Sequence, residues 1–548
     1  MRLNSWIVKG LLVVVLCPLL LFLAWPLLPT GSGEIPGEVQ VANADTWEVQ
    51  GELRGLWVSS VINLDYPTAP TTSQAELKRQ ADAILDKAAA LGFNAVYLQV
   101  RPCADALYDS ALYPWSVYLT GKSGQAPEGG FDPLQYWVEG AHSRHMELHA
   151  WINPYRITKA AAEWDKLAAD SPAKLHPEWV VSYKNNYYFD PALPEVRQLV
   201  IDGAVELVEN YGVDGIHMDD YFYPGTDFDD AASYAAYGQG FASIEDWRRD
   251  NVNQLVQGLA RAIHQADGSC EFGISPAGIW ASKTLNPLGS DTTSTYSSYY
   301  NMYADTRLWV KEGWLDYIAP QIYWEAGHKS ADFTALLDWW AETAAGTGVK
   351  LYIGLADYKT LEAKASDSPW YDGAEIGRQI LACGDKEEVA GTIHFRYGSI
   401  NASQALQRIL RQAYVEESLT AAAVAGPRGV SVLVDGAELD FADQKPEIVG
   451  GRVMLPMRVI FEALGAEVNY KDGQITAVKQ EGEEKLTIRL ELGSDQMLVN
   501  DEARKLDVAA YSVGGRTMLP LRAVSEALNC KVDWVGDEKQ VIITTKVQ

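Results

Sequence analysis

The segment Gly215-Ile216-His217-Met218-Asp219-Asp220 is a short apolar run of β type, and a helical pattern at Ile244–Ala266 follows it after a loop. Runs of the same two kinds alternate on both sides of this segment, so that eight strands and eight helices follow one another over residues 54–414. Strands that alternate with helices pair in parallel through right-handed crossovers. Because eight such units close a barrel, the sequence predicts an α/β fold of the (β/α)8 TIM-barrel type.

Polar or aromatic residues lie at the end of each expected strand or shortly after it. The strands span Arg54–Val61, Asn94–Val100, Glu147–Ile152, Gly215–Asp220, Glu271–Pro276, Tyr317–Tyr323, Lys350–Leu355 and Gly391–Tyr397. A doubly wound open sheet is the alternative for this alternation. Such a sheet seldom uses so many near-equal units, and no glycine-rich phosphate fingerprint follows the first strand. The barrel is therefore the favoured fold.

A second region follows the barrel and contains an internal repeat. The block Gly451–Arg458 (GRVMLPMR) recurs 64 residues later at Gly515–Arg522 (GRTMLPLR). A strand and a turn precede each copy, and a helix end and a strand follow it. We therefore expect a barrel domain at residues 53–416, a linker at 417–429 and a small duplicated α+β module at 430–548.

The first 29 residues predict export. Arg2 and Lys9 accompany the nearly unbroken apolar run Gly10–Leu28, and the first acidic residue is Glu34. Such a segment is a signal peptide or a membrane anchor. Residues 30–52 are polar, contain Gly and Pro, and predict a linker. We expect a protein of the cell envelope, membrane-anchored or secreted, that meets the membrane only through this N-terminal segment.

The composition limits the class of partner. A formal charge of −28, a pI near 4.7 and the lack of a basic stripe argue against nucleic acid. The five Cys residues are scattered without a CxxC pair, which argues against a disulfide framework and against a zinc site. The 18 Trp and 28 Tyr side chains suit the apolar faces of sugar rings, although many of them are expected in the core.

Acidic residues at a strand end are the first candidates for chemistry, because the active site of a TIM barrel lies at the C-terminal ends of its strands. Hydrolysis of an acetal needs one carboxylic acid and a second carboxylate. Asp219 and Asp220 stand at such an end amid Tyr and Phe. Adjacent strand residues point to opposite sides, so we expect Asp219 to face the barrel mouth, on the same side as His217. Asp220 would then cap the strand or join the site from the loop.

A further carboxylate is expected from another strand end. Glu325 follows the sixth strand, and it is our choice for this role. Asp65 and Asp357 follow the first and the seventh strands and are alternatives. Each of the three could equally be a solvated loop charge.

Other polar and aromatic side chains at strand ends suit contacts with a sugar. Amides and hydroxyls can bond to sugar hydroxyls, guanidinium groups can bind carboxylates, and indole rings can stack. On this basis the expected substrate contacts are Arg101, Asn153, Arg156, His217, Gln321, Tyr323 and Trp324. The two arginines could equally lock loops through ion pairs, and the histidine could equally be a hydrogen-bonded core residue.

Several of these segments resemble the bacterial glycosyl hydrolase-like family ten, over roughly residues 50–415. The matching segments are Arg54–Trp57, Gln99–Pro102, Trp151–Arg156, Gly212–Pro224, Ser275-Pro276 and Pro320–Trp324. The resemblance implies a barrel glycosidase of the bacterial envelope, since the family includes a division-site enzyme that cuts peptidoglycan strands stripped of their stem peptides. It implies Asp219 and Asp220 as active-site acids and, as cleft residues, Arg101, Asn153, Tyr155, Arg156, Tyr221, Gln321 and Tyr323. Glu325 lies outside the matching motif.

The C-terminal repeat resembles the small domain named after the N-terminus of copper amine oxidases, through its doubled G-R-x-x-L-P-x-R block. No His follows His394, so this stretch offers no histidine ligand for copper. The resemblance implies a module that binds the cell wall or acts as a spacer. A stabilising appendage without a ligand is the alternative.

These features predict an exported glycosidase that cleaves cell-wall glycan, namely peptidoglycan strands without stem peptides, by carboxylate acid/base catalysis with no cofactor and no metal. One alternative is a catalytically inactive glycan-binding barrel. The other is a metal-dependent polysaccharide hydrolase or deacetylase, which would use His149, His217 and His394 near three strand ends.

Overall fold

The computed structural model describes residues 51–363, 368–424 and 430–545, with short gaps in the last range at 440, 442–443, 445, 450, 472, 482–483, 514–515 and 536–539. The expected signal peptide or anchor at 1–29 and nearly all of the expected linker at 30–52 lie outside the described residues. Within the described residues, no helix combines the length and the apolar character that a membrane span requires.

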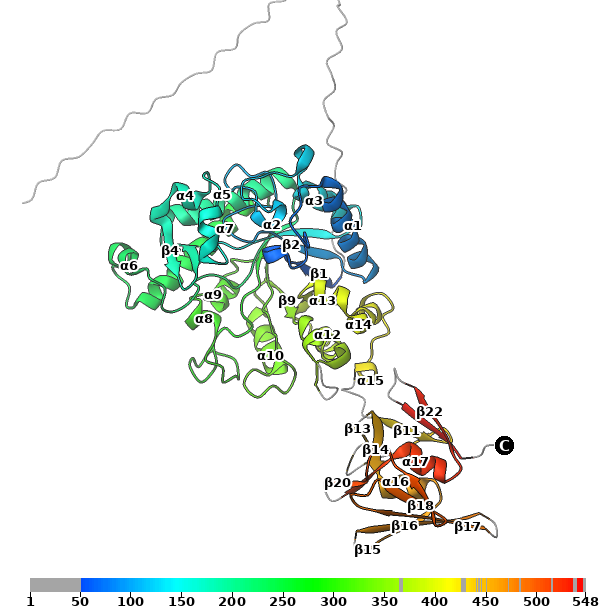
Figure 1. The fold of residues 1–548 in the computed structure, drawn as a ribbon. Coiled ribbons are helices and arrows are strands. Elements are labelled where there is room, and N and C mark those ends of the chain that lie inside the picture. Colours follow the sequence, from blue (N-terminus) through cyan, green and yellow to red (C-terminus); the bar gives the residue numbers. More distant parts are fainter. Residues whose placement is uncertain are drawn as a thin grey trace, which may run out of the picture. The chain divides into compact units, whose positions relative to one another are not determined.

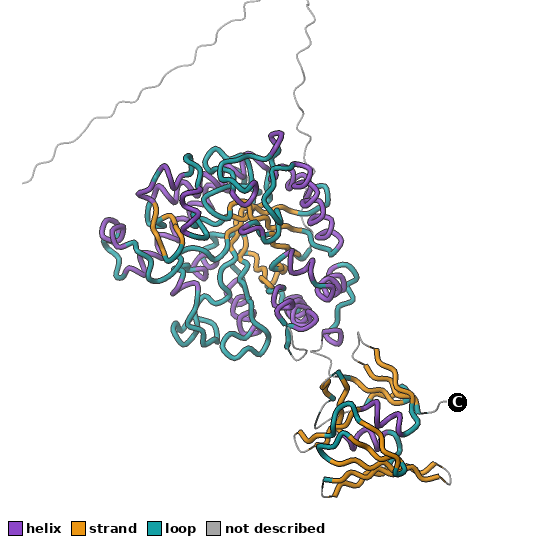
Figure 2. Tube along the Cα trace, in the orientation of Figure 1, coloured by secondary structure: helices purple, strands orange, loops and turns teal. Residues whose placement is uncertain are grey.

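Parallel strands form a closed barrel in residues 53–414 (Figures 1 and 2). In chain order they are β1 (Leu53–Val58), β2 (Ala95–Arg101), β3 (Glu147–Ile152), β6 (Gly215–Met218), β7 (Glu271–Ile274), β8 (Tyr317–Ile318), β9 (Lys350–Leu355) and β10 (Val389–His394). Neighbours in this order pair around the ring, and β10 closes it on β1 with His394 opposite Leu56. The prediction of a TIM barrel is confirmed.

Helices connect the strands and surround the barrel (Figure 2). The main ones are α1 (Gln74–Ala90), α3 (Pro133–His142), α5 (Pro194–Tyr211), α7 (Ile244–Ala266), α9 (Thr306–Lys311), α10 (Phe333–Ala344), α12 (Ala374–Gly384) and α14 (Gln404–Tyr414). Polar caps begin several of them, as Ser73 and Ser243 each accept a hydrogen bond from the third N–H of their helix. The loops add α2 (Val117–Thr120), α4 (Pro172–Leu175), α6 (Ala231–Tyr237), α8 (Ser298–Asn301), α11 (Tyr358–Glu362), α13 (Tyr397–Ala402) and the hairpin of β4 (Val180–Tyr183) and β5 (Asn186–Phe189).

Side chains of the barrel strands alternate between the interior and the helix layer. On β6, Ile216 and Met218 are buried in the core beneath the helices. His217 lies between them in sequence and stacks on the ring of Tyr317 inside the barrel. The interior is filled by further rings, among them Trp57, Tyr97, Trp151 and Tyr352. The expected phase of this strand is therefore confirmed.

Five strands end earlier than the sequence predicts, namely β1, β6, β7, β8 and β10, and the ends of β6 and β8 matter most for the site. β6 stops at Met218 rather than Asp220, and β8 stops at Ile318 rather than Tyr323. Pro320 contributes to the second early end because its ring nitrogen carries no hydrogen for a ladder bond. Past β6 the alternation of a strand is lost, since Asp219 and Asp220 line one cavity. Past β8 it continues through isolated bridges, with Gln321 and Tyr323 on the cavity side and Ile322 in the core.

The C-terminal module consists of small, mainly antiparallel sheets and two short helices, so the predicted α+β class is confirmed. Its elements are β11 (Ser431–Val434), β12 (Ala437–Glu438), β13 (Glu447–Val449), β14 (Arg452–Pro456), α16 (Met457–Ala463), β15 (Glu467–Lys471), β16 (Gln474–Glu481), β17 (Glu484–Glu491), β18 (Gln496–Val499), β19 (Glu502–Lys505), β20 (Tyr511–Val513), β21 (Arg516–Pro520), α17 (Leu521–Ala527), β22 (Lys531–Val535) and β23 (Gln540–Thr544). The two copies of the repeated block, β14 and β21, pair antiparallel with Leu455 opposite Leu519.

Part of the segment expected as a linker is helical. Residues Ala421–Val424 form α15, whose last side chain is buried in the same core as the barrel helices. The carbonyl oxygen of Val424 accepts a hydrogen bond from NH1 of Arg378 on α12 at 2.7 Å. Residues 425–429 of the expected linker lie outside the described residues.

Candidate active site

A cavity of about 320 Å³ opens among residues that follow the C-terminal ends of the barrel strands. Six aromatic side chains line it, namely Trp57, Trp151, Tyr221, Tyr323, Tyr358 and Phe395. Its charged lining residues are Asp219, Asp220, Arg156 and Lys159. The cavity thus combines flat apolar faces with a few ionisable groups, as small-molecule sites do.

Asp219 is buried at the wall of this cavity. Its two carboxylate oxygens each lie 2.7 Å from Nδ2 of Asn153, which donates to them, and Oδ1 also accepts from the N–H of Tyr221 at 3.2 Å. Burial raises the pKa of Asp219, while the charge of Arg156 and the Asn153 hydrogen bond act to lower it. These contacts fix the carboxylate and favour its ionised form.

Asp220 lines the same cavity and is only partly buried. Burial raises its pKa to about 7, and the negative charge of Asp219 adds to this rise. Because β6 ends at Met218, strand alternation does not separate the two side chains. Of the two places expected for Asp220, a strand cap or a loop position in the site, the structure favours the loop position, from which Asp220 lines the same cavity as Asp219. In this pair the pKa of both acids is raised by burial, Asp219 has the hydrogen bonds and the cation that oppose the rise, and Asp220 titrates near neutral pH.

We expect a reaction that uses Asp220 as an acid to slow as the pH rises through about 7. The pKa of this group is raised from 3.8 to about 7, so it is protonated below that pH and ionised above it. Profiles of kcat/KM from about pH 5 to about pH 9 would report this ionisation in the free enzyme. A profile that stays flat across pH 7 would show that another group supplies the proton.

Hydrogen bonds from three strands fix Asn153 and, through it, Asp219. Nε2 of Gln99 donates to Oδ1 of Asn153 at 2.7 Å, and NH2 of Arg156 donates to the same oxygen at 3.0 Å. Oε1 of Gln99 accepts in turn from the hydroxyl of Ser59 at 2.9 Å, after β1. These partners fix the orientation of both amides, so that Nδ2 of Asn153 is directed at the carboxylate.

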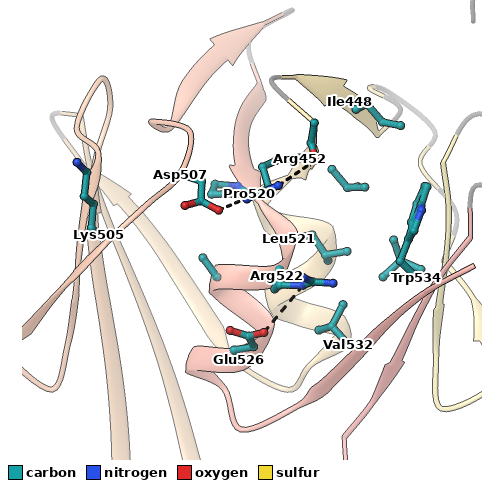
Figure 3. A pocket seen from close by; sticks show the side chains of 14 residues that line it. Ile448, Arg452, Lys505, Asp507, Pro520, Leu521, Arg522, Glu526, Val532 and Trp534 are labelled. Carbon is teal, nitrogen blue, oxygen red and sulfur yellow. Dashed lines mark hydrogen bonds and ion pairs between the residues drawn. The ribbon is translucent and has the colours of Figure 1, made fainter. Parts of the chain in front are cut away.

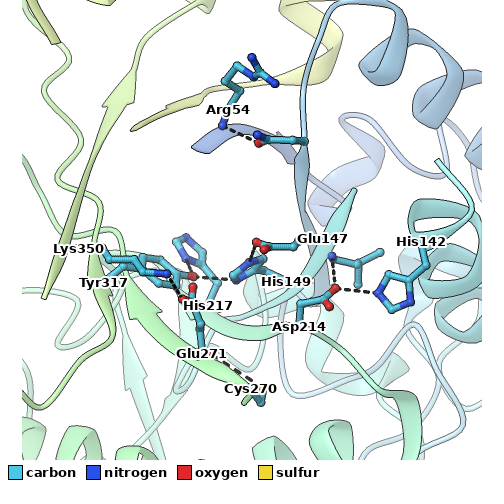
Figure 4. A network of polar contacts seen from close by, with 12 residues as sticks. Arg54, His142, Glu147, His149, Asp214, His217, Cys270, Glu271, Tyr317 and Lys350 are labelled. Atoms are coloured by element: carbon cyan, nitrogen blue, oxygen red, sulfur yellow. Dashed lines mark hydrogen bonds and ion pairs between the residues drawn. The ribbon is translucent and has the colours of Figure 1, made fainter. Parts of the chain in front are cut away.

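His217 lies inside the barrel and is not among the residues that line the cavity (Figure 4). Its Nε2 accepts a hydrogen bond from the indole N–H of Trp57 at 3.1 Å and lies 3.0 Å from Oγ of Ser275. Its Nδ1 lies 3.0 Å from the hydroxyl of Tyr317. Burial lowers the pKa of His217, so the ring is uncharged. Of its two expected roles the structure favours the core histidine, which positions Trp57 and Ser275 at the cavity wall.

Of the three histidines considered as metal ligands, His149 and His217 share the barrel interior beside the hydroxyl of Tyr317, whereas His394 has other partners. His149 lies in the barrel interior, 3.2 Å from the hydroxyl of Tyr317 and 3.2 Å from a carboxylate oxygen of Glu147 (Figure 4). His394 instead bonds to Asp357 at 3.0 Å. In the part of the chain that the structure describes, no three His, Cys, Asp or Glu side chains gather as a metal site. The residues therefore do not fit the metal-dependent alternative.

The sequence of the barrel region matches a known family. Residues 52–372 match the family described as glycosyl hydrolase-like 10. The chain belongs to this family. Residues 433–543 match the copper amine oxidase N-terminal domain. Both resemblances expected from the sequence motifs are thereby confirmed.

Relatives of this glycosyl hydrolase-like 10 protein include two bacterial proteins. Glycosyl hydrolase YngK of Bacillus subtilis (strain 168) is 45% identical over 355 residues, which cover 64% of this chain and 69% of YngK. Glycosyl hydrolase DigH of Escherichia coli (strain K12) is 38% identical over 387 residues, which cover 67% of this chain and 88% of DigH. Among solved structures, the PgaB (BpsB) glycoside hydrolase domain from Bordetella bronchiseptica aligns with a TM-score of 0.45 at 12% identity, over 66% of this chain and 99% of that one.

In this glycosyl hydrolase-like 10 protein Arg101 does not reach the cavity, so its expected place in the cleft is wrong. The register between β2 and β3 shifts between Gln99 and Arg101. Past this shift the guanidinium of Arg101 lies in the helix layer, 4.1 Å from the ring centroid of Tyr113. It also lies against α5, where a Cβ at Gly203 would approach it to 2.1 Å. Gln99 takes the inward position instead.

Three more expected site residues lie outside the cavity, and their expected places are wrong as well. Tyr155 is buried in the core beneath the helices. Trp324 packs against that core, and the carboxylate of Glu325 accepts a hydrogen bond from the indole of Trp370 at 3.1 Å. β8 ends at Ile318, so residues 324 and 325 are not held at the barrel mouth by strand geometry.

The alternatives to Glu325 have structural partners. Asp65 forms an ion pair with Arg396 and accepts hydrogen bonds from the N–H groups of Ser59 and Gly398 at 2.9 and 2.8 Å. Asp357 is buried against His394. Among the described residues, Asp219 and Asp220 are therefore the two acids that line the cavity.

Several lining residues were not expected from the sequence. Gln99 could have been found, because Ala95 and Tyr97 on the same strand share its inward phase. Lys159 follows β3 within an irregular loop, where no periodic pattern indicates direction. Tyr358 and Phe395 follow β9 and β10 and line the cavity, and no signal in the sequence had indicated a role for them there.

Proposed function

We propose that this chain hydrolyses glycosidic bonds, with Asp220 as the general acid and Asp219 as its charged partner. The observation that carries the proposal is the pair of carboxyl groups in one aromatic-lined cavity at the mouth of the barrel. Acetal hydrolysis requires two such groups in different protonation states. The surroundings of this pair favour that difference, since Asn153 and Arg156 support the Asp219 anion and burial raises the pKa of Asp220.

In the proposed reaction Asp220 first gives up one proton and later takes up another. In its acid form Asp220 gives its proton to the glycosidic oxygen while the bond from that oxygen to the anomeric carbon breaks. The negative charge of Asp219 stabilises the positive charge that develops at the anomeric carbon. Water then supplies its oxygen to this carbon, and its proton restores the acid form of Asp220.

Aromatic side chains support the assignment of a sugar as the ligand. Rings cover the apolar faces of sugars, and their polar handles reach hydroxyl groups. Tyr221 is 50% exposed, so its ring is accessible to a ligand from solvent. The guanidinium of Arg156 lies over that ring, 5.0 Å from its centroid, and this contact helps to hold the ring in the cavity that Asp219 also lines.

The proposed substrate is bacterial wall glycan, specifically peptidoglycan strands without stem peptides. The sequence likeness to family ten supports this choice, and relatives of the chain are named glycosyl hydrolases. Each muramic acid unit of a stripped strand carries a free lactyl carboxylate. Arg156 and Lys159, the cations that line the cavity, offer the opposite charge.

We also propose that the protein works outside the cytoplasm, in the cell envelope. The apolar leader at 1–29 supports export, as a signal peptide or as an anchor. The C-terminal module would then meet the wall from the same side of the membrane as the barrel.

A chain without residues 1–29 is expected to release new reducing ends from amidase-stripped peptidoglycan and not from intact peptidoglycan. The physical reason is that a stem peptide converts the lactyl carboxylate into a neutral amide and adds bulk at that position. Reducing ends are quantified from both substrates at equal glycan content. Equal release from both would overturn the substrate proposal, and no release from either by a chain that sediments with the wall would favour the inactive glycan-binding barrel.

A further inference from the structure

The C-terminal module contains a groove of about 380 Å³ that the proposed reaction does not use (Figure 3). Residues of β14, α17 and β22 line it, together with residues near β13 and β19. Two large apolar side chains of this lining are unusually accessible, since Trp534 is 40% exposed and Ile448 is 48% exposed. An accessible indole in a groove is a stacking surface for a flat apolar face, such as that of a sugar ring.

Cationic side chains line the same groove as this indole. In Figure 3, Lys505 and Trp534 lie on opposite sides of the groove, with Arg452 and Arg522 between them. The lining holds these three cations and two acids, whereas residues 430–548 as a whole contain 14 Lys and Arg against 20 Asp and Glu. The groove is therefore locally positive on a module with an acidic excess.

The existing ion pairs leave these cations available to a ligand. Arg452 contacts Asp507 at 2.6 Å, and Nε of Arg522 lies 4.0 Å from a carboxylate oxygen of Glu526. All four side chains are at least half exposed. Exposed pairs of this kind contribute only about 0–1 kcal/mol, so an incoming anion can share or replace the protein carboxylate at small cost.

The internal repeat supplies a matched reference for each key residue. At the 64-residue offset, Trp534 corresponds to Tyr470 and Arg522 corresponds to Arg458. Tyr470 is 47% exposed, and Arg458 lies 4.0 Å from Glu462 just as Arg522 lies 4.0 Å from Glu526. Neither Tyr470 nor Arg458 lines the groove. The surroundings of Tyr470 and Trp534 differ because the two residues lie on edge strands of different sheets, Tyr470 on β15 of the five-stranded sheet and Trp534 on β22 of a four-stranded one.

We propose that this groove is a second glycan site, which binds an acidic sugar strand through stacking on Trp534 and charge pairing with Arg452 and Arg522. Its occupant is the peptidoglycan strand without stem peptides, whose lactyl carboxylates recur along a chain of sugar rings. The identity of the occupant rests on the proposed function, whereas the site itself rests on the groove. Binding at two sites of one chain raises the effective concentration of strand at the barrel.

The test measures binding of the full chain to purified stripped strands. Every protein carries Asp220→Asn, which prevents hydrolysis and so keeps the strands at constant length during the measurement. Trp534→Ala is expected to weaken binding about tenfold, and Arg522→Ala about threefold to tenfold. Tyr470→Ala and Arg458→Ala, the matched controls, should change it less than about twofold. Thermal unfolding of each variant confirms that the module remains folded.

Chemical reduction of the lactyl carboxylates separates charge recognition from stacking. Reduced strands should bind the unsubstituted groove at least as weakly as native strands bind the Arg522→Ala groove, because reduction removes the anionic partner of both Arg452 and Arg522. Undiminished binding after Trp534→Ala, equal losses in the Tyr470→Ala control, or full binding of reduced strands would each overturn the proposal. These outcomes do not depend on turnover, so a failure of the hydrolase proposal would appear separately, as a wild-type chain that binds strands without cutting them.

Discussion

Replacing Asp220 with Asn is expected to lower kcat on stripped glycan strands by about 10²–10⁴-fold, the usual contribution of a general acid. Asn keeps the shape of the side chain but has no proton to give to the leaving oxygen. Because the raised pKa of Asp220 keeps it protonated below about pH 7, the loss should be greatest on the acid side of neutrality. Initial rates of reducing-end formation at about pH 6, where the group is protonated, would measure it.

Asp229→Asn is the matched control for this substitution. Asp229 lies in the same loop after β6, is exposed, and does not line the cavity. Its replacement is the same Asp→Asn change outside the cavity and should leave kcat within about twofold, because exposed charges interact weakly through water. If Asp220→Asn retained the rate of the Asp229→Asn control, Asp220 would not be the acid.

Replacing Asp219 with Asn should lower kcat about 10²–10³-fold, the typical cost of removing one group that stabilises transition-state charge. It should also change the pH dependence of the remaining activity. The charge of Asp219 helps to raise the pKa of Asp220, so its removal lowers that pKa. The fall in activity on the alkaline side should then occur at lower pH than in the wild-type protein.

The two effects of Asp219→Asn are separable by measuring full pH profiles of kcat/KM for both proteins. A rate loss without any shift of the alkaline limb would mean that the two carboxyl groups do not interact in the active protein. A shift toward higher pH would contradict the proposed arrangement, because the substitution removes the Asp219 charge that helps to raise the pKa of Asp220. Thermal unfolding should show whether loss of the Asn153 contact has disturbed the fold.

The support of Asp219 explains why the site needs the closed barrel. Asn153, after β3, donates a hydrogen bond to the carboxylate of Asp219. Gln99 on β2 donates to Asn153, and Ser59 after β1 donates to Gln99. These residues are far apart in the chain and meet because parallel strands bring their C-terminal ends to one rim. Orientation of Asp219 is therefore a property of four adjacent strands, β1, β2, β3 and β6, together.

The sequence by itself determined the barrel, because its signals are local. Apolar runs and helical periodicity fix each unit, and caps such as Ser73 and Ser243 begin helices where the sequence predicts them. Alternation along β6 also predicted that His217 points into the barrel and that Ile216 and Met218 point toward the helix layer. The repeated block similarly predicted the duplicated module, in which β14 and β21 pair.

Only the tertiary structure decided which strand-end residues share the cavity. The early end of β6 brings Asp220 beside Asp219, and the register shift in β2 turns Arg101 into the helix layer while Gln99 stays inside. The early end of β8 likewise leaves Glu325 outside the cavity. Where a strand stops pairing depends on its neighbours across the sheet, and their partners are distant in sequence. Periodicity within one segment therefore predicts which side chains of a strand point inward, and it cannot predict at which residue the strand ends.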